Sequence, residues 1–403
     1  MLPGLGGFGQ FGAVAAEAIG LGYMTEEALG EVSDTSASWL DTVTLSAAGA
    51  DFTPSADYLG LWSIDAQSNN TTSVIKGRVT VGGVDIFTTD TSLLPNEVTA
   101  PVDYYSMGGL FRYQPGASPA AETFKIQVAR GTNAATFKGR NARLSLLKLG
   151  GGDAYAQSVA RQTFDDPANK TAQTAGTLSF TPPSSGNYVV IVSCLIDLVS
   201  LTSTDIGLEL TDGTTSTGEL FYKSYTVDDR VPAFMVLLLP SISGAKTITL
   251  KIRQGGSGTS LIGISEIRIV AIREDRFASV NKAQSSSASS GTDTAYTATS
   301  VTQTFTPSSA DHLTVAAWAM NSDSTSISSY SEYSDGGTTL NEAIAELGSA
   351  TGATPNSTGC FSHRIASYAA AGRTQVINRK SESGATTRVA TKSTIVTFNL
   401  AGV

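Results

Sequence analysis

The sequence predicts an all-β protein: three tandem antiparallel β-sandwich, jelly-roll-like domains preceded by a short apolar, Gly-rich N-terminal arm. The first observation behind this fold class is the composition. Of the 403 residues, 41% are hydrophobic, only 15% are charged and 40 are glycines, while Thr and Ser are abundant. This balance is typical of β-domains whose strands are joined by polar turns. The second observation is an internal repeat.

The repeat is the motif Phe-Thr-Pro, followed by small polar residues and an apolar run, which begins at Phe52, Phe180 and Phe305. The copies stand 128 and 125 residues apart. Each copy ends in an alternating strand, a turn containing Gly with Thr or Ser, and a terminal strand. These closing segments are 121–149, 245–275 and 372–400. Two landmarks that recur in the same order at nearly the same separation indicate three homologous domains, each large enough to hold its own core.

The repeat sets the domain boundaries. We expect an N-terminal anchoring arm over 1–32 and β-sandwiches over 33–150, 151–276 and 277–403. Short linkers, "GGGDAYAQ" and "REDRFASV", would join the sandwiches in series. The sequence therefore predicts an elongated molecule that projects its domains outward.

The Phe-Thr-Pro motif is typical of a corner between two sheets. Its Phe places a ring in the core, and Pro stops the strand pairing because it has no N–H to donate. The next strand starts at Tyr58, Tyr188 or His312. A Tyr there can keep its ring at the core edge and its hydroxyl on a loop backbone.

Turns and helices complete the local prediction. "DGTT" at 212–215 and "DGGTT" at 335–339 are typical hairpin turns, because Gly supplies positive φ. Two short helices are expected. One covers Met24–Leu29, with Thr25 as its N-cap, and the other lies near Leu340–Leu347.

Motifs for chemistry are weak. "GLGGFG" at 4–9 matches a dinucleotide-binding pattern, but only three residues precede it, so the required strand is missing. Cys194 lies in an apolar run and is expected to be a small core residue, and Cys360 with His363 cannot alone complete a metal site. The repeats also share no acid or base at corresponding positions. We therefore expect no enzyme activity, no cofactor and no metal.

The N-terminal arm differs from the rest in being apolar, Gly-rich and free of positive charge, since the first basic residue is Lys76. It lacks the basic region of a signal peptide, and the longest apolar run, 231–242, is too short to cross a bilayer. The formal net charge of −9 disfavours nucleic acid as a partner. We expect the arm either to dock on another protein or to fold back on the first domain. The docking residues would be the apolar side chains of Leu2, Leu5, Phe8, Phe11 and Ile19.

The second repeat resembles the jelly-roll-type modules of tailed-phage virion proteins, which occur in fibres, in neck or head appendages and in decoration proteins. The residues that carry the resemblance are Phe180-Thr181-Pro182, Gly186–Val190 and Glu266–Asp275. The third repeat shares the pattern in part, and the first departs by closing with "LSLLKLGGG". The resemblance implies a structural component of a virion, made in the host cytoplasm, with no enzymatic residues to carry over.

Three roles remain open at this point. The first is a tail or neck appendage, anchored to other virion proteins by its arm and assembled in several copies as a homo-oligomer. The second is a capsid decoration protein. The third is an array of carbohydrate-binding modules that contacts a host surface glycan. Its candidate contacts are Tyr330 and Tyr333, with Trp62, Tyr104 and Tyr105 as further aromatic candidates, although the usual place of such a ring is a core or an interface.

Overall fold

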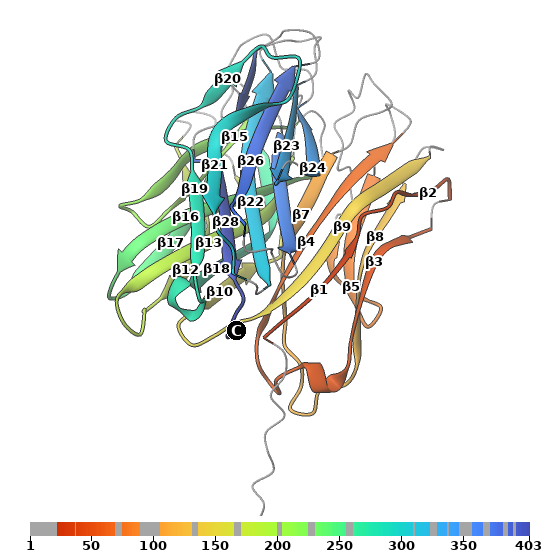
Figure 1. Cartoon of the computed structure of the whole chain (residues 1–403), viewed down its shortest axis with the longest axis vertical. Coiled ribbons are helices and arrows are strands. Elements are labelled where there is room, and N and C mark those ends of the chain that lie inside the picture. Colours follow the sequence, from red (N-terminus) through yellow and green to blue (C-terminus); the bar gives the residue numbers. More distant parts are fainter. Residues whose placement is uncertain are drawn as a thin grey trace, which may run out of the picture.

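In the part of the chain that the computed structural model describes, 28 strands form six antiparallel sheets (Figure 1). The sheets pair into three sandwiches, so the all-β sandwich prediction is confirmed. We call the sheet of each sandwich that faces the other two sandwiches its inner sheet, and the other its outer sheet. The described residues are 22–36, 38–68, 75–88, 105–130, 136–164, 171–199, 204–224, 230–254, 261–308, 311–322, 329–336, 338–345, 357–365, 371–381, 386–389 and 392–403.

The first sandwich uses the strands up to residue 148. Its inner sheet has the order β1-β9-β4-β7, with β2 also pairing with β9. These strands are β1 (Tyr23–Ala28), β2 (Val32–Asp34), β4 (Tyr58–Ser68), β7 (Tyr105–Tyr113) and β9 (Phe137–Lys148). The outer sheet has the order β3-β8-β5-β6. Its strands are β3 (Leu40–Ala47), β5 (Ile75–Val81), β6 (Val84–Thr88) and β8 (Glu122–Arg130), and a 3-10 turn, η1 (Gly49–Asp51), follows β3.

The second sandwich repeats this plan. Its inner sheet, β10-β18-β13-β16 with β11 on β18, contains β10 (Ala154–Ser158), β11 (Gln162–Phe164), β13 (Gly186–Leu198), β16 (Val231–Ile242) and β18 (Ile262–Arg273). Its outer sheet, β12-β17-β14-β15, contains β12 (Gln173–Phe180), β14 (Thr204–Thr211), β15 (Ser216–Ser224) and β17 (Lys246–Gln254). A second 3-10 turn, η2 (Glu274–Arg276), leads out of it.

The third sandwich extends its inner sheet with two short strands. The order is β19-β28-β22-β27-β20 with β25 on β22. These strands are β19 (Val280–Gln284), β20 (Ser289–Gly291), β22 (His312–Ser322), β25 (Ser357–Ile365), β27 (Thr387–Val389) and β28 (Thr394–Asn399). The outer sheet, β21-β26-β23-β24, contains β21 (Thr297–Phe305), β23 (Ser329–Asp335), β24 (Thr338–Ala345) and β26 (Arg373–Ser381).

Both helix predictions are wrong. Met24–Ala28 lies in β1, where Thr25 pairs with Ser145 of β9, and the segment near Leu340 is β24, paired with β23. In each case pairing with a neighbouring strand overrides a local helix propensity. Consequently residues 23–34 belong to the first inner sheet, and the segment that precedes the sandwiches ends before Tyr23.

The corner and turn predictions are confirmed. The motif Phe packs on the first aromatic residue of the next strand in all three repeats, with ring centroids 5.5, 5.1 and 6.1 Å apart. In the first corner the Thr53 N–H donates to the Tyr58 hydroxyl at 2.8 Å. In the hairpin at Asp212, the Asp212 N–H donates to the Thr215 carbonyl at 3.1 Å, and Gly213 has φ 87°.

The elongated arrangement is wrong, because the three inner sheets pack against one another around a single apolar cluster (Figure 1). Strand β13 shows how this is built. Val190 and Val192 point into the core of their own sandwich, whereas Val189 and Ile191 point into this cluster between the sandwiches. A strand that is apolar on both faces must be covered on both faces. We call the cluster the shared core. Its buried members are Leu59, Leu61, Leu110, Leu147, Val189, Ile191, Phe234, Val236, Val270, Ile272, Phe277, Leu313, Val315, Ala317, Val396, Phe398 and Leu400.

The shared core follows the repeat. Leu59, Val189 and Leu313 each come one residue after the corner aromatic, and all three are buried in it. Two residues further along, each sandwich again contributes an apolar side chain: Leu61, Ile191 and Val315. One chain therefore builds the approximate threefold arrangement that three copies of a single sandwich would form.

The closing segments of the three repeats share a backbone feature even where their residues differ. Asn141, Glu266 and Lys392 have φ of 52°, 53° and 63°. In each closing strand the side chain two residues later donates to the carbonyl of that residue: Arg143 at 3.0 Å, Arg268 at 3.2 Å and Thr394 at 2.8 Å. The backbone irregularity is thus retained while the side chain changes from arginine to threonine.

Polar contacts also join the sandwiches. Arg268, which is only 2% exposed, donates from Nη2 to the Ile86 carbonyl of the first sandwich at 3.1 Å. The Leu110 N–H donates to the Ser193 hydroxyl at 2.9 Å. The Tyr23 hydroxyl donates to the Asp311 carboxylate at 2.5 Å, which joins the first sandwich to the third.

Both ends of the described chain lie at one end of this assembly, which we call the base (Figure 1). The backbone of Gly22 passes so close to Val403 that a Cβ on Gly22 would lie 2.1 Å from the Val403 carbonyl carbon. The link between the first two sandwiches is also tied down at the base, since Arg276 forms an ion pair with Asp153 and donates to the Lys148 carbonyl.

Candidate functional site

The residues expected to dock the N-terminal arm lie outside the described residues. Leu2, Leu5, Phe8, Phe11 and Ile19 all precede Gly22. Docking through this arm therefore stays a prediction. What the structure adds is the position of Gly22 at the base.

The aromatic candidates for glycan contact fall into different environments. Tyr333 is 0% exposed and belongs to the core of the third sandwich, and Trp62 is buried in the core of the first, so neither ring can stack on a sugar. Tyr330 is half-buried, with the Lys380 ammonium 4.7 Å from its ring centroid. The same ammonium lies 4.3 Å from the ring of Tyr296. Tyr104 and the side chain of Tyr105 lie outside the described residues.

Each outer sheet has a polar cross-strand pair at the same place in the repeat. The Arg78 Nε donates to Gln127 at 2.7 Å in the first sandwich. In the second, the Lys251 ammonium donates to Glu209 at 3.2 Å, and in the third, the Asn378 amide donates to Glu332 at 2.8 Å. The pairs occupy equivalent registers of β5–β8, β14–β17 and β23–β26 but differ in charge. The outer sheets have therefore diverged where the shared core has not.

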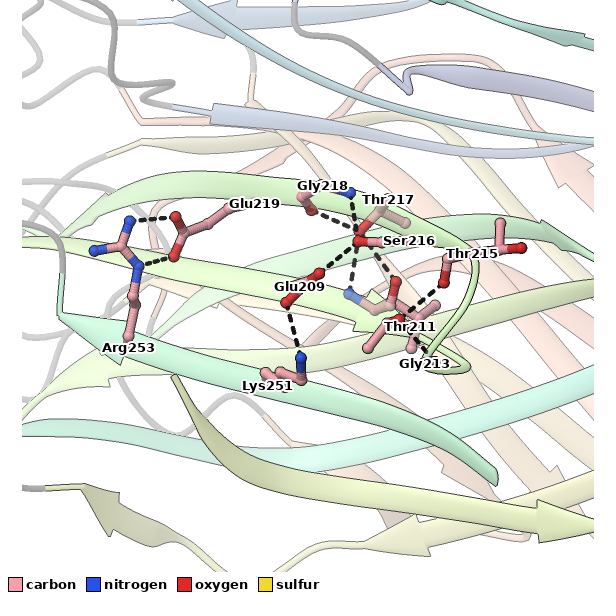
Figure 2. A network of polar contacts seen from close by, with 11 residues as sticks. Glu209, Thr211, Gly213, Thr215, Ser216, Thr217, Gly218, Glu219, Lys251 and Arg253 are labelled. Carbon is pink, nitrogen blue, oxygen red and sulfur yellow. Dashed lines mark hydrogen bonds and ion pairs between the residues drawn. The ribbon is translucent and has the colours of Figure 1, made fainter. Parts of the chain in front are cut away.

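The second outer sheet satisfies its charges internally (Figure 2). Glu209 accepts from the Ser216 hydroxyl at 2.6 Å as well as from Lys251. Beside it, Arg253 and Glu219 form a bidentate ion pair. This network of paired charges supports the sheet.

The turn that joins β14 to β15 extends this network (Figure 2). The Thr211 hydroxyl donates to the Thr215 carbonyl at 2.8 Å and accepts from the Gly213 N–H at 2.9 Å. The Ser216 hydroxyl accepts from the Gly218 N–H at 2.8 Å. The network therefore fixes the hairpin on β17.

Replacing Glu209 with Gln is expected to remove a small, pH-dependent part of the stability. The hydrogen bond from Ser216, followed by that from Lys251, holds the pKa of Glu209 below its ordinary value, against the desolvation of its partial burial. A lowered pKa stabilises the native state above the ordinary Glu value of about 4.3, and this contribution disappears as the pH falls through the lowered value. Solvent screening limits the effect to about 1 kcal/mol.

The measurement is the urea midpoint of the wild type and of Glu209→Gln at pH 7 and at pH 3. The two proteins should differ at pH 7 and converge at pH 3. Glu26→Gln, at an exposed position of β1, is the control and should show no such convergence. An equal difference at both pH values would contradict the assignment.

The first outer sheet is hollowed. A depression of about 410 Å³ is lined by Arg78, Thr80, Gly82, Gly83, Thr123, Lys125 and Gln127, from β5, β8 and the turn after β5. The half-buried Trp39 lies beside it, with its ring 4.2 Å from the guanidinium carbon of Arg78. This group of residues cannot be identified from the sequence, because its members come from separate strands and belong to no motif.

Metal ligands, the cysteine thiol and membrane-spanning helices can also be assessed in the described residues. In those segments no group of three His, Cys, Asp or Glu side chains could hold a metal ion. Cys194 is a free, buried thiol, as expected of a small core residue, and burial raises its pKa. No helix in the described part of the chain is long and apolar enough to span a membrane.

No family model matches the sequence, and no curated protein matches it. Among solved structures, the chain is similar to the infectious bursal disease virus VP2 subviral particle, with a TM-score of 0.24 and 8% identity over 94% of this chain and 79% of that chain. It is also similar to the Sulfolobus turreted icosahedral virus structure, with a TM-score of 0.20 and 11% identity over 92% and 91%.

A third similar structure is Eiger TNF from S. frugiperda, with a TM-score of 0.21 and 13% identity over 30% of this chain and 90% of that chain. At such low TM-scores and identities these likenesses carry no argument about function. The proposals below rest on the chain's own residues.

Proposed function

We propose that the chain is a non-catalytic structural component of a virion: a head of three sandwiches attached to other virion proteins by the residues before Tyr23. The observation that carries this proposal is the shared core, because it makes one chain a self-contained threefold head. The resemblance of Phe180-Thr181-Pro182, Gly186–Val190 and Glu266–Asp275 to phage virion modules supports the class of particle.

The geometry of the base supports the attachment. Gly22 and Val403 lie side by side there, together with the Phe-Thr-Pro corners and the links between sandwiches. An apolar segment that leaves the head at this end can reach a partner without covering the outer sheets or the opposite end. A blunt head of this kind fits the end of an appendage or a decoration on a capsid, and we propose the appendage first.

The test is a deletion that ends at residue 21. Removing residues 1–21 keeps β1 intact, whereas a deletion to residue 30 would remove a strand paired with β9. We expect the truncated protein to unfold at the same temperature as the full chain and to be absent from purified particles. A full chain carrying Leu29→Ser, an exposed position, is the control and should be incorporated. Normal incorporation of the truncated protein would refute the anchoring role, and cryo-electron microscopy of the particle would separate appendage from decoration.

A further inference from the structure

The depression on the first outer sheet is lined by cationic side chains, whose carboxylate partners lie outside the lining. The chain carries a net charge of −9, yet the charged side chains that line the depression are both cationic: Arg78 and Lys125. Of the other polar lining side chains, Thr123 and Gln127 supply a hydroxyl and an amide, whereas Thr80 is only 2% exposed. A small concave surface with cations, a hydroxyl and an amide has the donors and acceptors that an anionic, polyhydroxylated ligand requires.

The cationic side chains are held in place by partners that lie outside the lining. The Arg78 Nη1 contacts the Asp85 carboxylate at 3.0 Å, and the Lys125 ammonium contacts Asp41 at 2.6 Å. Asp41 also accepts from the Gln127 amide at 2.5 Å, so Arg78, Gln127, Asp41 and Lys125 form one continuous chain of hydrogen bonds. Groups ordered in this way lose little conformational entropy when a ligand binds.

Trp39 adds a further constraint on Arg78. Its ring packs on the guanidinium in a cation–π contact, which restricts the positions that Arg78 can adopt. Because Trp39 does not line the depression, we assign it a positioning role. Glu122 lies beside Gly82 at the base side of the depression, so an anionic group is expected at the Arg78 side.

The equivalent positions of the other sandwiches show that the fold does not require this group. Where the first sandwich has Arg78 and Gln127, the second has Glu209 and Lys251, locked in the network of Figure 2. The third has Glu332 and Asn378. All three outer sheets are stable β-structure, so the cationic lining of the first is not a structural necessity.

We propose that this depression binds an acidic saccharide, a sugar that carries a carboxylate. Arg78 and Lys125 bind the carboxylate, while Thr123 and Gln127 hydrogen-bond to ring hydroxyls. This inference does not depend on where the protein resides, so it can fail while the virion proposal stands, and the reverse.

Tryptophan fluorescence of the full chain tests the proposal directly. The protein has three Trp residues, and Trp62 and Trp318 are buried, so Trp39 alone reports on the surface next to Arg78. Titration with sialyllactose and with a glucuronate disaccharide is expected to change the fluorescence with a Kd of about 1 mM or below. Lactose should bind at least about tenfold more weakly, and added salt should weaken the acidic sugars.

Variants separate a specific site from general charge. Arg78→Ala and Lys125→Ala are each expected to weaken binding about tenfold or more, since hydrogen bonds between charged groups are lost. Lys251→Ala, at the matched register of the second outer sheet, should leave binding unchanged. Because Trp39→Phe removes the reporter, binding to that variant is measured by saturation-transfer NMR, where it should persist.

Four outcomes would overturn the proposal. The first is no change in fluorescence with either acidic sugar at about 10 mM, a concentration well above the expected Kd. The second is equal binding of lactose, and the third is sulfate or phosphate competing as well as the acidic sugars bind. The fourth is an equal loss of binding in Lys251→Ala and Arg78→Ala. Thermal unfolding of each variant checks that the head remains folded. If Arg78→Ala does not fold, Lys125→Ala gives the same test.

Discussion

Replacing Ile191 with Ala is expected to lower the free energy of unfolding by about 2–5 kcal/mol, as much as a core truncation within a single sandwich. Ile191 lies on β13 and is 0% exposed, yet it faces away from the core of its own sandwich and into the shared core. The matched control is Ile196→Ala on the same strand, which is also 0% exposed but lies in the core of the second sandwich.

The measurement is the urea transition followed by tryptophan fluorescence, and the second sandwich contains no tryptophan. Trp62 belongs to the first sandwich and Trp318 to the third. If the shared core couples the three sandwiches, Ile191→Ala in the second must shift the fluorescence-detected urea transition of the other two. Independent tandem domains would leave that transition in place, and Ile191→Ala would then cost within about 0.5 kcal/mol, as surface substitutions do.

Replacing Phe52 with Ala is expected to cost about 3–5 kcal/mol, because the ring is fully buried and makes three ring contacts. Its centroid lies 5.5 Å from that of Tyr58, 5.3 Å from Tyr113 and 6.2 Å from Phe124. Loss of the ring removes these contacts and loosens the packing of Tyr58, whose hydroxyl accepts a hydrogen bond from the Thr53 N–H. The measurement is chemical denaturation followed by circular dichroism and by fluorescence of Trp62.

The control for this prediction is the same residue of the second repeat. Phe180 starts an equivalent corner but is only partly buried, and packs on Tyr188 at 5.1 Å. Phe180→Ala should therefore cost distinctly less than Phe52→Ala. If the two substitutions cost the same, the corners are equivalent in energy and the difference in burial has no consequence.

The corner could be predicted from sequence because its determinants are adjacent in the chain. Phe180, Pro182 and Tyr188 lie within nine residues, and local rules for proline and aromatic residues suffice. The hairpin at Asp212 could be predicted for the same reason. The strand β1 could not, since Glu26 and Glu27 favour a helix locally and only the pairing with Leu144 and Arg143 of β9, more than one hundred residues away, makes them a strand.

The shared core left a signal in the sequence. The run "VVIVSCLI" is apolar at both even and odd positions, which indicates burial of both faces of a strand. Sequence alone does not say what covers the second face. The candidate site is harder still, because Asp41, Arg78, Lys125 and Gln127 come from three strands and acquire meaning only through the register of the outer sheet.

The shared core also constrains how the protein is made. The strands of the first sandwich are complete once residue 148 has been synthesised. The shared core around Leu59 and Leu61, however, is complete only when Leu400 has been added. At about 5–20 residues per second, the ribosome needs roughly 10–50 s to add that remainder. During this interval a finished β-sheet exposes an apolar face wide enough to cover two neighbours. The price of a threefold head in one chain is a nascent protein that is prone to aggregate until its final residues emerge.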